Sequence, residues 1–184
     1  VKTLVSEEET LLVLTADHGV MQIPEILNDK KFMLPKRISV ENLMEEMNKT
    51  IENEYGIKDI VSLFEAPQFY LNKDALKESG SHQKHIIKRL KELVEAKPYI
   101  RHCWTSKELR TRESGDDEYK KLFAKQIYKD RGGELTCFLQ PYQMLTKYGA
   151  GTSHATPYKY DLHVPLSIYQ KNKEYSKAVE IARM

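Results

Sequence analysis

Two residues that could bind a metal ion follow a short apolar segment near the start of the chain. Asp17 and His18 come directly after residues 10–16, Thr-Leu-Leu-Val-Leu-Thr-Ala. A carboxylate beside an imidazole suits a transition metal such as zinc, because both groups are common ligands of that ion. The triplet Asp17-His18-Gly19 could equally be a turn in which the aspartate side chain accepts a hydrogen bond from a backbone N–H. Taken alone, the triplet leaves both interpretations open.

Two further histidines lie near the other end of the sequence. His154 falls within residues 146–162, which are rich in Gly, Thr, Ser, Tyr and Pro and are predicted to form a loop, and His163 follows that loop. Each histidine alone is more often an ordinary polar loop residue than a metal ligand. Here, however, the histidine loop leads into a predicted strand at 163–169, and another predicted strand ends at Asp-His. This combination favours a metal site more than either histidine does alone.

The remaining histidines and the cysteines favour ordinary packing or solvent exposure. His82 and His85 share a predicted helix with several lysines, so a solvated face is expected. His102 lies beside Cys103 in a predicted strand, where core or edge packing is more common than metal binding. Cys103 and Cys137 are far apart and lack Cys-x-x-Cys spacing, so they predict neither a disulfide framework nor a cysteine zinc site. Two small buried apolar side chains are expected instead.

The apolar segment at 10–16 is predicted to be a strand that positions Asp17 and His18. Because it shows no polar alternation, it is expected to be buried on both faces, as in parallel α/β sheets. Ligand sites in such sheets gather at the carboxyl ends of the strands. Gly19 would let the chain turn sharply as it leaves the sheet.

The segment between the two histidine motifs is predicted to be an inserted α+β subdomain. Its clearest helix begins after Ser39, a good N-cap, and stops at Gly56. The other expected strands are 59–65, 68–71, 99–104 and 135–139, and the other expected helices are 82–96, 105–112, 116–129 and 172–183. We therefore predict an α/β protein in three parts: a core strand with the first motif at 1–23, the α+β insert at 24–134, and the second motif with another core strand at 135–184.

Composition excludes several classes of protein. The chain has 184 residues, of which 40% are hydrophobic and 30% charged, a balance typical of a globular domain. Lys plus Arg number 29 against 27 for Asp plus Glu, and this near-balance argues against a nucleic-acid-binding surface. The sequence contains no apolar run long enough for a membrane segment, no Gly-x-Ser-x-Gly elbow, no phosphate loop and no dinucleotide fingerprint. It begins at Val1 without an initiator Met, and we expect it to be a piece of a longer protein.

The two motifs together resemble those of the alkaline phosphatase superfamily. The relevant residues are 12–20, Leu-Val-Leu-Thr-Ala-Asp-His-Gly-Val; 153–158, Ser-His-Ala-Thr-Pro-Tyr; and 160–166, Tyr-Asp-Leu-His-Val-Pro-Leu. The chain is most similar to the zinc-dependent bacterial alkaline phosphatases of the type I phosphodiesterase/nucleotide pyrophosphatase-like branch. In that branch a strand ends in Thr-x-Asp-His-Gly, and a His-Gly-(Ser/Thr)-Pro-Tyr loop and Tyr-Asp-x-His-Val-Pro-Leu follow much later. The resemblance implies alkaline phosphatase-like core strands that form a partial sheet, in the C-terminal fragment of such an enzyme.

This resemblance implies a site for two zinc ions that is incomplete here. Asp17 and His18 would bind one ion, His154 would bind the other, and His163 would support the site without being a ligand. The family's Thr or Ser nucleophile and its remaining ligands match no residue of this sequence, so we expect none of its own residues to be catalytic. Ala155 is a further departure, because the family usually has glycine there.

The function that follows is the hydrolysis of phosphate monoesters or diesters by the full enzyme. By resemblance, a metal-activated Thr or Ser attacks phosphorus, and the phosphoryl-enzyme is then hydrolysed by a metal-bound hydroxide. The 184-residue chain alone is expected to be inactive. The resemblance also suggests a periplasmic or extracellular location, although the sequence shows no signal peptide. The alternative is a non-catalytic α+β binding or interaction domain whose histidines are ordinary loop residues.

Overall fold

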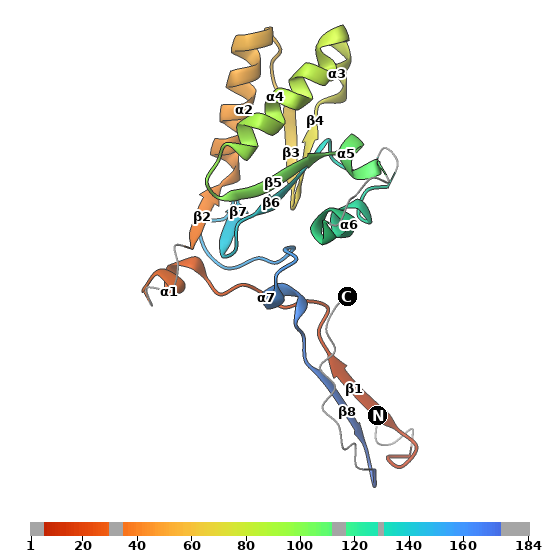
Figure 1. The fold of residues 1–184 in the computed structure, drawn as a ribbon. Helices are drawn as coiled ribbons and strands as arrows, with labels where there is room; N and C mark the ends of the chain where they lie inside the picture. The colour runs from red at the N-terminus through yellow and green to blue at the C-terminus, as the bar shows by residue number, and fades with distance from the viewer. Residues whose placement is uncertain (1–5, 30–34, 112–116, 129–130, 174–184) are drawn as a thin grey trace.

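The chain forms an α/β body and a two-stranded ribbon that projects from it (Figure 1). The computed structural model describes residues 6–29, 35–111, 117–128 and 131–173. No helix among these described residues is both long enough and apolar enough to cross a membrane. The mixed α/β architecture with partial sheets agrees with the predicted fold class.

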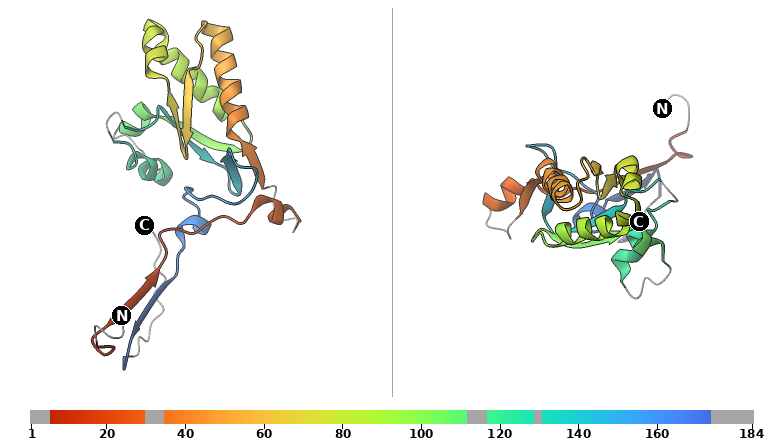
Figure 2. Two further views of the ribbon diagram at one scale, coloured as in Figure 1. Left: turned by 180° about the vertical axis from the view of Figure 1, so that it is seen from behind. Right: turned by 90° about the horizontal axis from the view of Figure 1, so that it is seen from above.

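The body is built on a four-stranded antiparallel sheet with the strand order β3-β4-β6-β5. Its strands are β3 (Val61–Glu65), β4 (Gln68–Leu71), β5 (Ile100–Thr105) and β6 (Leu135–Leu139). All four were predicted, with small differences at their ends. Two long helices pack on this sheet, α2 (Val40–Tyr55) and α4 (Gln83–Glu95) (Figures 1 and 2).

Helix α2 begins and ends where its sequence predicts. The Ser39 side chain accepts a hydrogen bond from the backbone N–H of Asn42 at 3.2 Å, which caps the helix. Gly56 ends it in the left-handed conformation, at a φ of 73°, and donates its N–H to the Glu52 carbonyl. Because only glycine adopts this conformation without strain, the sequence alone was sufficient to locate the stop.

The sheet separates two apolar clusters, because successive side chains along its strands point to opposite faces. Cys137 on β6 faces the main core, which includes Met47 and Ile51 of α2 and is closed by α4. The next residue, Phe138, points to the opposite face and packs with Trp104 and other aromatic side chains. That second cluster is covered by two short helices, α5 (Ser106–Arg110) and α6 (Glu118–Ala124). Strands β5 and β6 therefore pack against apolar side chains on both faces of the sheet, whereas Leu63 on the edge strand β3 is 50% exposed.

Several short elements were not predicted. They are α1 (Pro24–Asp29), β2 (Lys36–Ser39), α3 (Lys73–Glu78), the 3₁₀ turn Gly80–His82, β7 (Gln143–Thr146) and α7 (Lys159–Leu162). Strands β2 and β7 pair in parallel, which joins the start of the predicted insert to the segment after it. Strand β6 likewise pairs with β4 and β5, so the four-stranded sheet crosses the predicted boundary at residue 134.

The ribbon corrects the prediction for the first strand. β1 (Leu11–Thr15) is a strand as expected, but it pairs antiparallel with β8 (Leu166–Gln170) and is exposed along its whole length. Leu14 is 69% exposed. Neither the parallel pairing nor the burial on both faces is observed, because β8 is its only strand partner within the described residues. An apolar sequence indicates that a strand can be buried, but it does not indicate which segments pack against it.

Two predicted elements differ at their ends. The strand expected from residue 163 begins at Leu166, so His163 lies before it rather than within it. Helix α6 is shorter than the predicted 116–129, a range that partly lies outside the described residues. Most of the helix predicted at 172–183 also lies outside them.

Candidate metal site

The structure brings His18 and His154 into direct contact, although they lie in distant parts of the sequence. Their imidazole rings are stacked, with centroids 3.5 Å apart and planes inclined by 15°. His18 follows β1 after a short connection, and His154 lies in the loop between β7 and α7. The two motifs that the sequence places far apart therefore meet at the junction between the ribbon and the body.

Asp17 and His18 offer a pair of donors with suitable spacing for zinc. Nδ1 of His18 lies 2.8 Å from the Gly19 carbonyl oxygen, which can only accept, so Nδ1 carries the proton and the lone pair is left on Nε2. That Nε2 is 3.7 Å from Oδ2 of Asp17. Two ligands of a tetrahedral zinc ion, each at its normal bond length, are about 3.3 Å apart, so a small rotation of the carboxylate is sufficient.

Both donors are accessible from solvent. The side chain of Asp17 is 89% exposed and that of His18 is 35% exposed. Oδ1 of Asp17 accepts the backbone N–H of His18 at 3.0 Å, which restrains the carboxylate beside the ring. Among the described residues, no group of three His, Cys, Asp or Glu side chains is arranged to hold one metal ion. The donor types and spacing fit zinc, whereas their number is below the three protein ligands of a catalytic site.

A tight backbone contact fastens the two motifs together. The N–H of Gly19 donates to the Asp161 carbonyl at 2.7 Å. A Cβ atom on residue 19 would overlap the carbonyl oxygen of Tyr160, which belongs to the backbone and cannot simply move aside. Gly19 is not among the glycines with positive φ. Glycine is required here by the close approach of α7, and not by the sharp turn that the sequence suggested.

Asp161 also holds the loop that carries His154. It is 3% exposed, and its Oδ2 accepts both the N–H of Thr156 at 2.8 Å and the hydroxyl of Thr156 at 2.6 Å. The hydroxyl of Thr152, on the other side of His154, donates to the Met21 carbonyl. Contacts on both sides of His154 thus fix the position of its backbone relative to the segment that follows His18.

Arg37 provides a third attachment for the loop. Its guanidinium donates to the Gly151 carbonyl at 2.7 Å and to the Tyr148 carbonyl at 3.3 Å. The same group binds both carboxylate oxygens of Glu25, at 2.8 and 3.0 Å. This hydrogen bond raises the pKa of Arg37 and lowers the pKa of Glu25. The pair therefore stays charged at neutral pH, and Arg37 continues to hold the loop.

Ala155 lies in the left-handed region, with a φ of 91°. An L side chain is strained in this conformation, which is a physical reason for glycine at this position in the family that the chain resembles. We expect Ala155→Gly to stabilise the chain by about 0.5–1 kcal/mol, since relief of the strain exceeds the entropy that glycine adds to the unfolded state. Thermal unfolding should show a Tm rise of about 2–4 °C per kcal/mol.

The matched control for this prediction is Ala75→Gly, inside helix α3. There the same chemical change should destabilise the protein by about 1 kcal/mol, because glycine has a low helix propensity. A fall in Tm for Ala155→Gly of the same size as for the control would show that residue 155 is not strained.

His163 is placed differently from the other predicted site residues. It follows α7 as its C-cap, and its N–H donates to the Lys159 carbonyl at 2.8 Å. Its side chain is exposed. Within the described part of the chain it makes no hydrogen bond or ring contact with His18 or His154.

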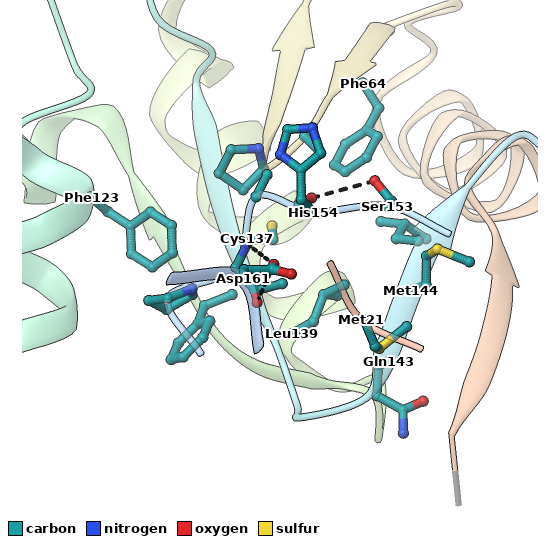
Figure 3. A pocket seen from close by; sticks show the side chains of 17 residues that line it. Met21, Phe64, Phe123, Cys137, Leu139, Gln143, Met144, Ser153, His154 and Asp161 are labelled. Carbon is teal, nitrogen blue, oxygen red and sulfur yellow. Dashed lines mark hydrogen bonds between the residues drawn. The ribbon is translucent and has the colours of Figure 1, made fainter. Parts of the chain in front are cut away.

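A small cavity lies behind the His154 loop, between that loop and strands β6 and β7. Figure 3 shows the side chains that line it, among them His154, Ser153 and Asp161 and apolar side chains such as Phe64 and Met144. Its volume of ≈ 40 Å³ suits a few water molecules at most. A ligand larger than water could therefore reach Asp17 and His18 only from the solvent side, where Asp17 is exposed.

Sequence reasoning did not identify Arg37 or Asp161 as residues that position the site. The signal for Asp161 was its place in the motif Tyr160-Asp161-Leu162-His163, because a carboxylate there needs a specific partner if it is buried. Arg37 carries no comparable signal. Its role depends on a parallel pairing between β2 and β7 that the sequence does not reveal.

Comparison with known proteins shows that solved structures share this fold. No protein-family model matches the chain. A curated relative named calcium-transporting ATPase, from Myroides odoratus, is 21% identical over 159 residues, which are 84% of this chain and 28% of that protein. Among solved structures, the wild-type alkaline phosphatase PafA matches with a TM-score of 0.76 and 18% identity, over 90% of this chain and 31% of its own.

A variant of the same phosphatase, which carries several substitutions, matches with a TM-score of 0.70 and 19% identity, over 86% of this chain and 29% of its own. The chain thus spans less than a third of the length of the proteins it matches. At this level of identity the likeness concerns the fold. The chain has an α/β fold that matches part of the alkaline phosphatase fold.

Proposed function

We propose that this chain is part of a metal-dependent hydrolase of phosphate monoesters or diesters. In this proposal Asp17 and His18 bind one zinc ion, and His154 binds a second. The observation that carries it is the stacked pair of His18 and His154, with Asp17 Oδ2 3.7 Å from His18 Nε2. The structural likeness to an alkaline phosphatase supports the substrate class.

The stacking geometry favours two ions over one. The lone pair of an imidazole nitrogen lies in the plane of its ring, so two nearly parallel rings direct their lone pairs along parallel planes. These planes are separated here by about the ring distance of 3.5 Å. The two metal ions of phosphoryl-transfer sites are about 3.5–4 Å apart. Each ring can therefore serve a different ion of such a pair.

The chain's own residues would hold and orient this centre. Gly19 fixes the tautomer of His18 through its carbonyl oxygen, Asp17 supplies an exposed carboxylate, and Asp161 holds the loop that presents His154. Such supporting contacts orient ligands and tune their affinity. We propose that His163 supports the site indirectly, through its backbone N–H, which caps the helix α7 that carries Asp161. When bound, the metal pair would polarise the phosphoryl oxygens and stabilise the attacking and leaving groups.

The nucleophile and the remaining ligands are proposed to come from outside residues 1–184. The exposed ribbon supports this part of the proposal, because Leu12, Leu14 and Ile168 are 54%, 69% and 43% exposed. An exposed apolar ribbon of this kind favours packing against further protein. The solved phosphatase offers such protein, since this chain matches only 31% of it.

Zinc binding by the full 184-residue chain tests the proposal. We expect the Asp17→Ala/His154→Ala double variant to bind zinc at least about tenfold more weakly than the unsubstituted chain, since even loss of a supporting residue costs 10–100-fold. Competition with a chromophoric chelator measures the affinity.

The matched control for zinc binding is His85→Ala, on the exposed face of α4 far from the site. Its zinc affinity should equal that of the unsubstituted chain. An unchanged affinity in the double variant would instead favour the alternative, a binding domain without metal chemistry.

A further inference from the structure

Cys103 and Cys137 form a buried pair at the centre of the sheet. Cys103 on β5 is directly opposite Cys137 on β6, and their Sγ atoms are 2.6 Å apart. Both side chains are buried, with 0% and 3% of their surface exposed. The sequence predicted two small buried apolar side chains and no disulfide framework, and the burial is confirmed. Both cysteines are free in the structure, but their sulfur atoms are closer together than two unbonded sulfurs normally approach.

The backbone around the pair suits a disulfide bond. The N–H of Cys103 donates to a carboxylate oxygen of Glu95 at 2.9 Å, and the N–H of Cys137 donates to the Pro67 carbonyl at 2.9 Å. Neither N–H therefore donates to the other cysteine, which identifies a non-hydrogen-bonded pair of the antiparallel ladder. Cα atoms in such pairs are about 4.5 Å apart. This separation lies inside the range of about 4.4–6.8 Å that disulfide bonds span.

We propose that Cys103 and Cys137 form a structural disulfide that links β5 to β6. The inference concerns the body alone and does not depend on the proposed phosphatase function. The bond would close a loop between residues that are 34 positions apart and would include α5 and α6. It would tie the edge strand β5 to the centre of the sheet.

Thiol–disulfide exchange with a disulfide such as oxidised glutathione provides a balanced route. One cysteine thiolate attacks a glutathione sulfur, which forms a mixed disulfide and releases one glutathione thiolate. The second cysteine thiolate attacks the protein sulfur of that mixed disulfide, which forms the Cys103–Cys137 bond and releases the second glutathione. The protein gives up two electrons and two protons, and they end on the two glutathione thiols.

This thiol–disulfide exchange is expected to occur during folding, and not in the folded protein. Burial raises the pKa of Cys137 well above its ordinary value, and the adjacent Cys103 adds to the shift. The thiolate is the reacting form, so the buried pair exchanges slowly once the core has closed. The disulfide would form before α2 and α4 cover this face of the sheet.

Refolding of the full chain tests the proposal. Denatured, reduced protein is refolded with reduced and oxidised glutathione, the folded monomer is unfolded in denaturant with an alkylating reagent so that buried free thiols also react, and its peptides are mapped by mass spectrometry. A second preparation is exported to a bacterial periplasm, where the chain folds under oxidising conditions. We expect a Cys103–Cys137 linked peptide, and a Tm about 10 °C above that of the reduced protein.

The control is the Cys103→Ala/Cys137→Ala variant, whose Tm should not change with reductant. Folded monomer in which both thiols are alkylated, in the refolded and in the exported protein, would overturn the proposal. So would a linked peptide whose reduction leaves the Tm unchanged, because the bond would then have no structural role.

Discussion

A Gly19→Ala substitution is expected to separate His18 from His154 and to lower the zinc affinity of the chain at least about tenfold. The added Cβ would overlap the carbonyl oxygen of Tyr160, so either the segment after His18 or helix α7 must move. Either shift breaks the hydrogen bond from the Gly19 N–H to the Asp161 carbonyl. Because the segment after His18 and helix α7 are in tight backbone contact here, a small displacement is expected to unstack the rings.

The body should remain folded in this variant, because its clusters lie on the two faces of the four-stranded sheet and do not include Gly19. Circular dichroism would check this point. Gly149→Ala is the matched control, since a Cβ there meets no atom within 4 Å. Wild-type zinc affinity in Gly19→Ala would show that the close approach of Gly19 and Tyr160 does not position the metal ligands.

The second large effect concerns catalysis. The purified 184-residue chain is expected to hydrolyse p-nitrophenyl phosphate at the uncatalysed rate, even with added zinc. A catalytic zinc ion normally has three protein ligands, and Asp17 and His18 supply two. The hydroxyls nearest His154 are also committed to other contacts. Ser153 donates to the His154 carbonyl at 3.4 Å, Thr152 donates to the Met21 carbonyl, and Thr156 donates to the Asp161 carboxylate.

The assay needs a control for contaminating phosphatases, because trace amounts of an efficient enzyme would dominate a slow rate. The Asp17→Ala/His154→Ala variant, purified in the same way, provides it. Chelator-sensitive hydrolysis that is present in the unsubstituted chain and lost in this variant would contradict the prediction. It would show that the 184-residue chain contains a complete catalytic centre.

Signals in the sequence were sufficient to locate helices whose ends are set by residues of the same segment. Ser39 and Gly56 mark the ends of α2, and Thr105, the first residue of the helix expected at 105–112, caps α5 by accepting the N–H of Glu108 at 3.1 Å. Short elements such as β7 and α7 were missed because their residues gain strand or helix geometry only from tertiary partners. Propensity in so few residues cannot compete with such contacts.

The candidate site shows the same division. The residue types at Asp17, His18 and His154 indicated metal chemistry, and the structure brings the two histidines together. Spacing in the sequence could not predict the stacking, nor the role of Arg37, because both depend on how distant segments pack. The apolar character of β1 indicated a buried strand, whereas the described residues leave it exposed, since a hydrophobic pattern does not specify its partner.

Anomalous diffraction from crystals of the chain grown with zinc is the most direct test of whether Asp17 and His18 bind a metal ion next to His154. We predict an anomalous zinc peak about 2.0–2.2 Å from a carboxylate oxygen of Asp17 and from Nε2 of His18. A second peak is expected at a ring nitrogen of His154. Zinc found only at other side chains, with Asp17 and His18 unliganded, would contradict the account.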